Sequence, residues 1–431
     1  MIARYPGRLR SYFRVRNDPI ELLFDVVRAC GDFARFDVLT YRFYLVNDPA
    51  LLREALVEKS EQLIIQGGAS RGLARLIGDG ILTNRGERWR ESRTSLQPLF
   101  HQSALTASLP VICARVQESL DRWRTRFDGI PFALNRELLA LSFRIKCSAL
   151  FHCLPSFEEA EEFADAIRVL QLEGMARFLD GNDLVPWLPL AVNRKVNRAR
   201  ATLYRLAQQL VDRGAAQPRD EILSLLFAGT ESPVNTLCFA LKLLEDHPLW
   251  REKIVADQCV PAEVERFDSL AQVISESIRL YPAGWAFERT ASEDVRLGGE
   301  LIRKGGRLLF SPFLLHRNPR FWRDPERFDP LRFDRGQSSA EGVPKYGYLP
   351  FGAGPRSCIG ARLALAEMRI ALGMIVAQCR WKTQSVPGEP PLKPEGSFKI
   401  RLSRPLFVTT DFRSSRTPPK TPLPTGKDAS A

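Results

Sequence analysis

Residues 351–360 read Phe-Gly-Ala-Gly-Pro-Arg-Ser-Cys-Ile-Gly and place Cys358 behind a glycine-rich turn. Glycine permits positive φ angles and lets the backbone approach a flat ligand closely. From residue 361 onward apolar residues recur at helical spacing, which predicts a helix beginning just after the cysteine. The dipole of that helix, with Arg356 two residues before Cys358, favours the thiolate form of the cysteine. A thiolate in such a loop suits iron as a ligand.

This stretch resembles the haem-binding loop of the cytochrome P450 monooxygenases. The residues that match the fixed positions of that loop are Phe351, Gly354, Arg356, Cys358 and Gly360. The resemblance implies that Cys358 is the axial ligand of the haem iron and that Phe351, Arg356 and Gly360 contact the haem. The alternative for an isolated cysteine is a buried structural role. The length of the motif and its strand–turn–helix setting favour the ligand.

The chain has 431 residues, of which 45% are hydrophobic, so it can bury a large core. The resemblance spans roughly residues 20–411 and implies a mainly α-helical, cytochrome P450-like fold with a small β region. In that fold the haem lies between a long distal helix and the helix that follows the Cys loop (residues 351–360). We therefore expect one domain over residues 1–411. Residues 412–431 contain four prolines among Ser, Thr and Lys, which predicts a disordered tail.

Periodic apolar residues predict helices at about residues 19–30, 49–59, 87–100, 193–213, 221–246, 248–258 and 270–280. Alternating apolar residues predict a β-hairpin over residues 36–46 and strands within 295–311 and 406–411. Residues 65–83 are glycine-rich, and the resemblance implies an irregular loop there that contacts substrate. Only residues 214–220 separate two of the predicted helices, where the family has more chain, so one helix is expected to be shortened or lost.

Lysine and arginine outnumber aspartate and glutamate by 62 to 50, which gives a net charge of +12. A basic surface suits an acidic protein partner, and we find no nucleic-acid-binding motif. The eight cysteines form no Cys-x-x-Cys pair, which favours reduced thiols in a cytoplasmic protein. Residues 1–17 contain no apolar run of signal-peptide or membrane length. We therefore expect a cytoplasmic monomer without a membrane anchor or a nucleic-acid partner.

Haem carries two anionic propionates, which need donors from the protein. Trp89 and Arg93 lie four residues apart on one face of a predicted helix, and the resemblance implies that this pair reaches a propionate. Arg289, His316 and Arg356 occupy the positions of the family's other propionate contacts. For His316, a capping or core role remains the open alternative.

Residues 228–233 read Ala-Gly-Thr-Glu-Ser-Pro and resemble the family's oxygen-side motif, Ala-Gly-x-acid-Thr. The resemblance implies that Gly229 contacts haem and that Glu231 and Ser232 are the catalytic acid and alcohol. A hydroxyl that donates and accepts, beside a carboxyl group that recharges it through water, meets the need for protons in splitting dioxygen. An exposed Glu and a back-bonded Ser are the alternative. Pro233 cannot donate to the Gly229 carbonyl, so it is expected to open the helix there.

Glu276 and Arg279 lie three residues apart on a predicted helix, where a weak surface ion pair is the simplest explanation. Residues 324–328 read Asp-Pro-Glu-Arg-Phe and resemble the family's second arginine motif. The resemblance implies that Glu276, Arg279 and Arg327 form one buried ion network that holds the segment before the Cys loop. Arginine suits this role because its planar group bonds two oxygens at once.

Together these motifs imply a haem-thiolate monooxygenase that contains haem b and inserts one oxygen atom of dioxygen into its substrate. The chain shows no flavin or ferredoxin domain, so electrons are expected from NAD(P)H through a separate acidic ferredoxin and its reductase. The expected docking residues are Arg85, Arg88, Arg90, Arg362 and Arg369. Two alternatives remain open: a haem-thiolate peroxygenase or isomerase, and a non-catalytic haem sensor.

The residues expected to contact substrate are apolar, namely Leu170, Leu172, Phe178, Leu179, Trp285, Phe287 and Phe398. Apolar pockets bind ligands mainly by burying their apolar surface. The expected substrate is therefore a small lipophilic molecule such as a terpenoid, a fatty acid or a polyketide.

Overall fold

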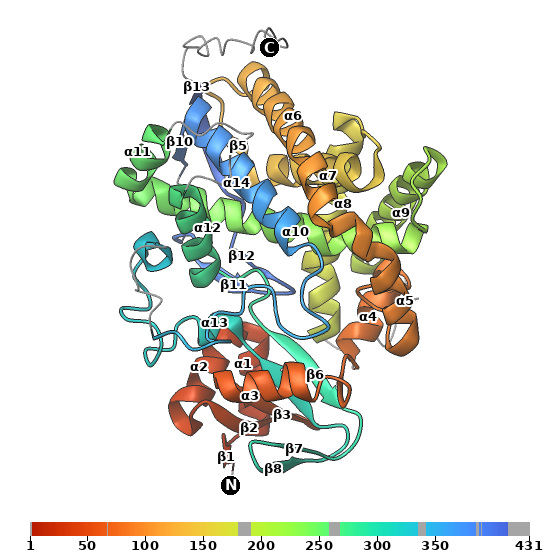
Figure 1. Cartoon of the computed structure of the whole chain (residues 1–431), viewed down its shortest axis with the longest axis vertical. Helices are drawn as coiled ribbons and strands as arrows, with labels where there is room; N and C mark the ends of the chain where they lie inside the picture. Colours follow the sequence, from red (N-terminus) through yellow and green to blue (C-terminus); the bar gives the residue numbers. More distant parts are fainter. Residues whose placement is uncertain are drawn as a thin grey trace, which may run out of the picture.

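A computed structural model describes residues 2–66, 68–179, 191–257, 268–334, 342–384, 388 and 390–412 of the chain. Helices make up most of the protein, and a small sheet lies at the end that holds the N-terminus (Figure 1). The predicted mainly α-helical fold with a small β region is confirmed. The sequence predicts a disordered tail over residues 412–431, but Phe412 ends a β-strand, and residues 413–431 lie outside the described residues.

Helix α10 (Arg219–Asp246) runs through the middle of the protein (Figure 1). It is apolar on most sides, which is typical of a buried helix, and it packs against α7 (Leu134–Phe151), α12 (Asp268–Leu280) and α14 (Ala361–Gln378). Pro233 lies inside α10, yet the helix continues through it without a break. Within the described part of the chain α10 is also the one helix long and apolar enough to cross a membrane, and most of that apolar stretch is buried in the protein.

The other helices of the described residues are α1 (Arg8–Asn17), α2 (Pro19–Cys30), α3 (Pro49–Arg53), α4 (Gly68–Ile77), α5 (Gly86–Leu96), α6 (Gln102–Arg126), α8 (Phe157–Leu179), α9 (Ala191–Asp212), α11 (Pro248–Ala256) and α13 (Pro312–Leu315). Most predicted helices are found within a few residues of their expected bounds. The prediction of an irregular segment over 65–83 is wrong in part, because α4 forms there and buries Leu73 and Ile77, spaced four apart. No helix lies between α9 and α10 in residues 213–218, as the short connection predicts.

The main sheet joins the start of the chain to a much later segment. Its strands run in the order β1 (Ala3–Arg4), β2 (Phe33–Val38), β3 (Tyr41–Val46), β9 (Arg307–Phe310), β6 (Phe287–Ala291) and β4 (Leu63–Ile64). The predicted hairpin is β2–β3, and β3 pairs in parallel with β9. The smaller sheets contain β5 (Phe132–Ala133), β7 (Val295–Leu297), β8 (Glu300–Ile302), β10 (Cys379–Thr383), β11 (Pro394–Gly396), β12 (Ile400–Leu402) and β13 (Phe407–Phe412).

A buried ion network joins α12 to the segment before the Cys loop. Glu276 and Arg279 are both completely buried, and their two nitrogen–oxygen contacts are 2.6 and 2.8 Å. Arg279 also donates to the carbonyl oxygens of His316 at 2.8 Å and Pro325 at 2.7 Å. Since α12 is thereby bonded to two later segments, the pair has the structural role that the resemblance implies.

The third member of this network is Arg332 rather than the predicted Arg327. The Arg327 side chain is exposed, and Arg327 joins the network only through its carbonyl oxygen, which accepts from Arg279 at 3.2 Å. Arg332 is buried in the 3₁₀ turn Pro330–Phe333, and its Nε lies 3.5 Å from the Glu276 carboxylate. Residues 329–333 repeat the Asp-Pro-x-Arg-Phe pattern of 324–328, and the turn directs the second arginine inward.

Candidate active site

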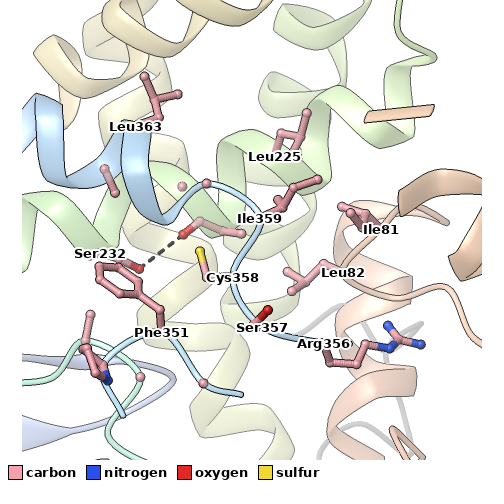
Figure 2. Close-up of a pocket in the computed structure, with 18 of the residues that line it drawn as sticks. Ile81, Leu82, Leu225, Ser232, Phe351, Arg356, Ser357, Cys358, Ile359 and Leu363 are labelled. Atoms are coloured by element: carbon pink, nitrogen blue, oxygen red, sulfur yellow. Dashed lines mark hydrogen bonds between the residues drawn. The ribbon is translucent and has the colours of Figure 1, made fainter. Parts of the chain in front are cut away.

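A cavity of about 430 Å³ lies between α10, α5 and the Cys loop. Nine of the eleven predicted site residues line it: Trp89, Arg93, Gly229, Ser232, Arg289, Phe351, Arg356, Cys358 and Gly360. Figure 2 shows the sulfur of Cys358 among the lining residues and the guanidinium group of Arg356 turned away from that sulfur. The structure thus brings together residues from four distant parts of the chain, and it leaves Glu231 and His316 outside the lining.

The Cys loop is a series of tight turns that ends at the N-terminus of α14. The Cys358 N–H donates to the Phe351 carbonyl at 2.9 Å, and the Ser357 N–H donates to the Gly354 carbonyl at 3.0 Å. Gly354 has a φ of 71°, and a Cβ atom there would lie 1.9 Å from the carbonyl oxygen of Leu56. Only glycine meets both constraints, so the loop is held against the backbone of Leu56 with Cys358 facing the cavity.

The Cys358 side chain is exposed to the cavity although it lies deep inside the protein. Burial raises the pKa of its thiol, and the Gly360 N–H and the Arg93 guanidinium group oppose that rise. A metal cation bound to the sulfur would replace the thiol proton outright. Of the cysteines in the described residues, Cys358 alone lines this cavity, so it is the candidate ligand there.

Three arginines line the cavity without a carboxylate partner among the described residues. Arg93 donates to the Ser357 carbonyl at 2.9 Å and Arg356 to the Asn84 carbonyl at 3.1 Å. Arg289 likewise donates to a backbone carbonyl oxygen, that of Glu288, at 2.8 Å. Carbonyl oxygens satisfy hydrogen bonds but do not neutralise charge, so this side of the cavity is strongly positive.

The positive charge of this arginine cluster indicates an anionic ligand. Burial, and after it repulsion from Arg289, Arg85 and Arg93, lowers the pKa of Arg356 to about 9. Burial alone lowers the pKa of Arg289 to about 10. Buried charges without counter-charges are unfavourable, and the two propionates of haem would supply the missing negative charge. The three arginines and the Cys358 sulfur, which line one cavity, therefore fit haem in charge and ligation.

The predicted haem contact at His316 is not supported by its position. His316 is completely buried, and its Nε2 accepts from the Leu349 N–H at 2.8 Å. Its ring lies 4.9 Å from that of Tyr348. Burial, followed by repulsion from Arg279 and Arg317, lowers the pKa of His316 to about 3, so the imidazole is neutral. These contacts fit the core alternative, in which His316 supports the segment leading into the Cys loop.

The side chains of the oxygen-side residues Ser232 and Glu231 lie in different environments, since Ser232 lines the cavity and Glu231 does not. Ser232 lines the cavity, and its Oγ donates to the Ala228 carbonyl at 3.2 Å. Glu231 is 6% exposed and does not line the cavity, and its Oε2 lies 3.9 Å from the Nζ of Lys399. Burial raises the pKa of Glu231, which Lys399 opposes. The Glu231 carboxyl group is thus neither exposed nor in direct reach of the cavity.

The sequence-based prediction missed three buried charged residues beside the cavity. Lys399 contacts α10, while Lys146 of α7 forms an ion pair with Glu367 of α14. The Ser142 hydroxyl also donates to Glu367, at 2.5 Å, and Lys146 itself lines the cavity. For Lys146 and Glu367 the available signal was a charged residue inside an otherwise apolar helical pattern, since lysine and glutamate are rarely buried unless paired.

The rest of the lining is mainly apolar and includes Ile65, Ile81, Leu82, Phe100, Leu225, Phe287 and Leu363. Of the predicted substrate contacts, Phe287 lines the cavity, whereas the Nε1 of Trp285 donates to the Ser397 carbonyl outside it. Phe398 packs edge-on against Phe227. The side chains of Phe178 and Leu179 lie outside the described part of the structure. The apolar lining favours a lipophilic ligand.

Comparison with known proteins matches the chain to the family model for cytochrome P450 over residues 10–221 and 216–407. The two matches meet where the sequence predicts a shortened segment. The chain is 29% identical to cyclooctat-9-en-7-ol 5-monooxygenase of Streptomyces melanosporofaciens, over 84% of each chain. It is 25% identical to pentalenene oxygenase of Streptomyces avermitilis, over 82% of this chain and 84% of that one. The crystal structure of CYP175A1 from Thermus thermophilus matches with a TM-score of 0.77 at 26% identity, covering 95% of this chain and 100% of that one.

Proposed function

The chain belongs to the cytochrome P450 family of haem-dependent monooxygenases, and from this premise we propose that it oxidises a small lipophilic molecule, with terpenoids as the leading class. The observation that carries the proposal is the Cys358 sulfur in an apolar cavity that also contains Ser232 and three arginines without counter-charges. Two relatives named for the oxidation of cyclooctat-9-en-7-ol and pentalenene support the substrate class. We further propose one domain over residues 1–411, a cytoplasmic location and a monomeric state.

The proposed roles of the residues follow from where they lie. Haem, when bound, supplies an iron centre that can bind dioxygen and accept electrons, which amino-acid side chains cannot do. Cys358 would provide the ligand sulfur, and Arg93, Arg289 and Arg356 would bind the propionates. Ser232 would pass a proton from its Oγ into the cavity. Because Glu231 does not line the cavity, we propose that it recharges Ser232 through water.

A ligand screen tests the proposed substrate class. Terpenoids, fatty acids and polyketides are added to the purified haem protein, and the spin state of the iron is followed by absorption. We expect terpenoids to give the largest change and to be oxidised when NADPH, a ferredoxin and its reductase are supplied. A response to fatty acids alone would contradict the terpenoid class, and a purified protein without haem would contradict the function itself.

Electron transfer from an acidic ferredoxin is expected to slow as the salt concentration rises, because salt screens the attraction between exposed charges. Arg88 and Arg362 are exposed, whereas Arg90 is already paired with Glu87 at 3.0 Å. We therefore expect the double variant Arg88→Glu/Arg362→Glu to reduce the association rate by about tenfold at low salt. Stopped-flow reduction of the haem measures this rate.

The matched control for this docking prediction is the double variant Arg303→Glu/Lys304→Glu. Arg303 and Lys304 are both exposed and lie between β8 and β9, in the part of the protein where Figure 1 places β8. This control carries the same charge change away from the Cys loop and should leave the rate nearly unchanged. If both variants slow reduction equally, the effect reflects net charge and the proposed docking face is wrong.

Replacement of Ser232 by alanine is expected to divert electrons from product to hydrogen peroxide. Ser232 is the hydroxyl of the oxygen-side motif that lines the cavity, and proton transfer by a positioned group typically contributes at least about a hundredfold in rate. We expect the product formed per NADPH to fall by about tenfold or more. Ser232→Thr is the control, because it keeps the hydroxyl and restricts its rotamer. Equal coupling in the wild type and the alanine variant would exclude this role.

A further inference from the structure

Lys399 is a buried lysine that reaches the turn of α10 carrying the oxygen-side motif. It precedes β12 in the C-terminal hairpin and is 8% exposed. Its Nζ donates to the carbonyl oxygens of Ala228 at 2.8 Å and Phe227 at 3.3 Å. The same nitrogen lies 3.9 Å from Oε2 of Glu231. Lysine is rarely buried unless it is paired, and these three oxygens account for its position.

The Ala228 carbonyl oxygen is shared between Lys399 and Ser232. The Lys399 contact is 2.8 Å long, and the contact from the Ser232 hydroxyl is 3.2 Å. A carbonyl oxygen has two lone pairs, and in an uninterrupted α-helix the N–H four residues later takes one of them. Lys399 and the Ser232 hydroxyl therefore compete for the other. Because Lys399 is the closer donor, it weakens the hydrogen bond from the Ser232 hydroxyl to the Ala228 carbonyl. The hydroxyl can then rotate toward the cavity that Ser232 lines.

The Glu231 carboxyl group depends on Lys399 for its charge. Burial raises the pKa of Glu231, and the positive charge of Lys399 is the largest opposing influence, followed by the Asn235 side chain and Arg401. Asn235 also donates to the Ile400 carbonyl at 2.9 Å, so this neighbour is fixed to the same hairpin. At 3.9 Å the contact with Lys399 is an ion pair without a hydrogen bond.

Lys399 has further charged neighbours besides Glu231. Burial lowers the pKa of Lys399, and the negative charges of Glu231 and then Cys358 oppose the change, while Lys146 adds to it. The charge on Lys399 is therefore maintained mainly by Glu231. Each member of the pair stabilises the ionised form of the other.

We propose that Lys399 is a positioning residue for proton delivery, which binds the Ala228 carbonyl so that the Ser232 hydroxyl can face the cavity and pairs with the carboxylate that Glu231 becomes when it has given up its proton. The protonated Glu231 carboxyl group gives its proton through water to Ser232 Oγ, Ser232 passes its own proton into the cavity, and Glu231 is left as the carboxylate. This inference rests on the proposed function for the roles of Ser232 and Glu231. It adds that the C-terminal hairpin, rather than α10 alone, sets the protonation and direction of these two groups.

Two substitutions separate the two effects of Lys399. Lys399→Gln keeps an N–H donor for the Ala228 carbonyl and loses the charge, whereas Lys399→Met loses both. Without the positive charge, the pKa of Glu231 rises further, so its carboxyl group keeps its proton to a higher pH. The control is Arg401→Met, which removes one positive charge from the same hairpin. Arg401 is the weaker influence on Glu231 and already pairs with Glu395 at 3.0 Å.

Infrared spectroscopy measures the Glu231 proton without requiring turnover. Light-induced difference spectra of the carbon monoxide complex are recorded against pH, and the protonated-carboxyl band absent from Glu231→Gln is assigned to Glu231. We expect its titration midpoint to rise by about one pH unit or more, tenfold in proton affinity, in both Lys399 variants. Arg401→Met should shift it much less. An unchanged midpoint in Lys399→Met and Lys399→Gln overturns the pairing.

Coupling of electrons to product tests the position of Ser232 separately. The measurement is made at a pH below the Glu231 midpoint of every variant, so that the carboxyl group is protonated throughout. We expect Lys399→Met to release several-fold more hydrogen peroxide per NADPH, and Lys399→Gln to match the wild type. Equal coupling in all three proteins overturns the positioning role. If no substrate is oxidised by the wild type, the proposed function fails, while the infrared titration still decides the pairing.

Discussion

The Cys358→Ala variant is expected to lose the thiolate signature of its reduced carbon monoxide complex and all measurable turnover. Cys358 is the one cysteine of the described residues that lines the cavity, and hydrogen bonds to Phe351 and from Gly360 hold it there. An alanine offers no ligand atom, and among the described residues no other cysteine lines the cavity to replace the lost sulfur. Absorption of the reduced carbon monoxide complex measures the ligand, and product formation measures turnover.

The control for this substitution is Cys30→Ala. Cys30 lies at the end of α2, outside the cavity. Its replacement removes a cysteine sulfur from the protein without changing the Cys loop. We expect its spectrum and activity to match those of the wild type. A wild-type carbon monoxide spectrum in Cys358→Ala would mean that another residue holds the iron, and the assignment of the site would then be wrong.

The Arg279→Leu variant is expected to lose about 3–5 kcal/mol of stability, because the completely buried Glu276 carboxylate loses its two closest ionic contacts and keeps only Arg332, at 3.5 Å, and the Asp329 N–H. Burial already raises the pKa of Glu276, and Arg279 opposes this rise. Without Arg279 the pKa of Glu276 in the folded protein rises further. A raised carboxyl pKa costs stability only at pH values where the same group is ionised in the unfolded chain. The deficit relative to the wild type is therefore expected to grow with pH once the pH exceeds the raised pKa that Glu276 has in the wild type, and to level off above the still higher pKa in the variant.

Urea unfolding at several pH values measures this deficit, and haem content measures its effect on the site. Arg327→Leu is the control, since the Arg327 side chain is exposed and only its carbonyl joins the network. Such a surface change is expected to stay within about 0.5 kcal/mol of the wild type. A deficit in Arg279→Leu that does not depend on pH would show that lost packing, rather than the lost ionic contacts of Glu276, causes it.

The sequence predicts the parts of the site that depend on local geometry. The Cys loop is recognisable because its glycines, Arg356 and Cys358 meet turn and helix-start requirements within ten residues. Helical spacing places Trp89 and Arg93 on one face of their helix, and the resemblance, rather than the spacing, predicts that this face reaches the cavity. These residues reach the cavity because their own elements direct them there.

Residues whose role depends on distant contacts are predicted poorly. Arg327 and Arg332 stand in the same local pattern, and only the 3₁₀ turn around Arg332 shows which one is buried. His316 occupies a plausible position in the sequence but bonds to Leu349 instead of lining the cavity. Lys399 carries no local signal, because its partners lie on α10, far away in the chain. Tertiary packing decides these three cases, and it is not encoded in a short window.

The parallel pairing of β3 with β9 has a consequence for the order in which the protein folds. Phe43 pairs with Arg307, so the first hairpin lacks its neighbouring strand until most of the chain has left the ribosome. Closing so long a loop is entropically costly and slows folding. Until β9 arrives, β3 exposes an unpaired edge that can associate with other chains. Helical segments such as α6 and α7 form from local contacts meanwhile, so the N-terminal sheet is expected to be completed after these helices although its first residues are synthesised before them.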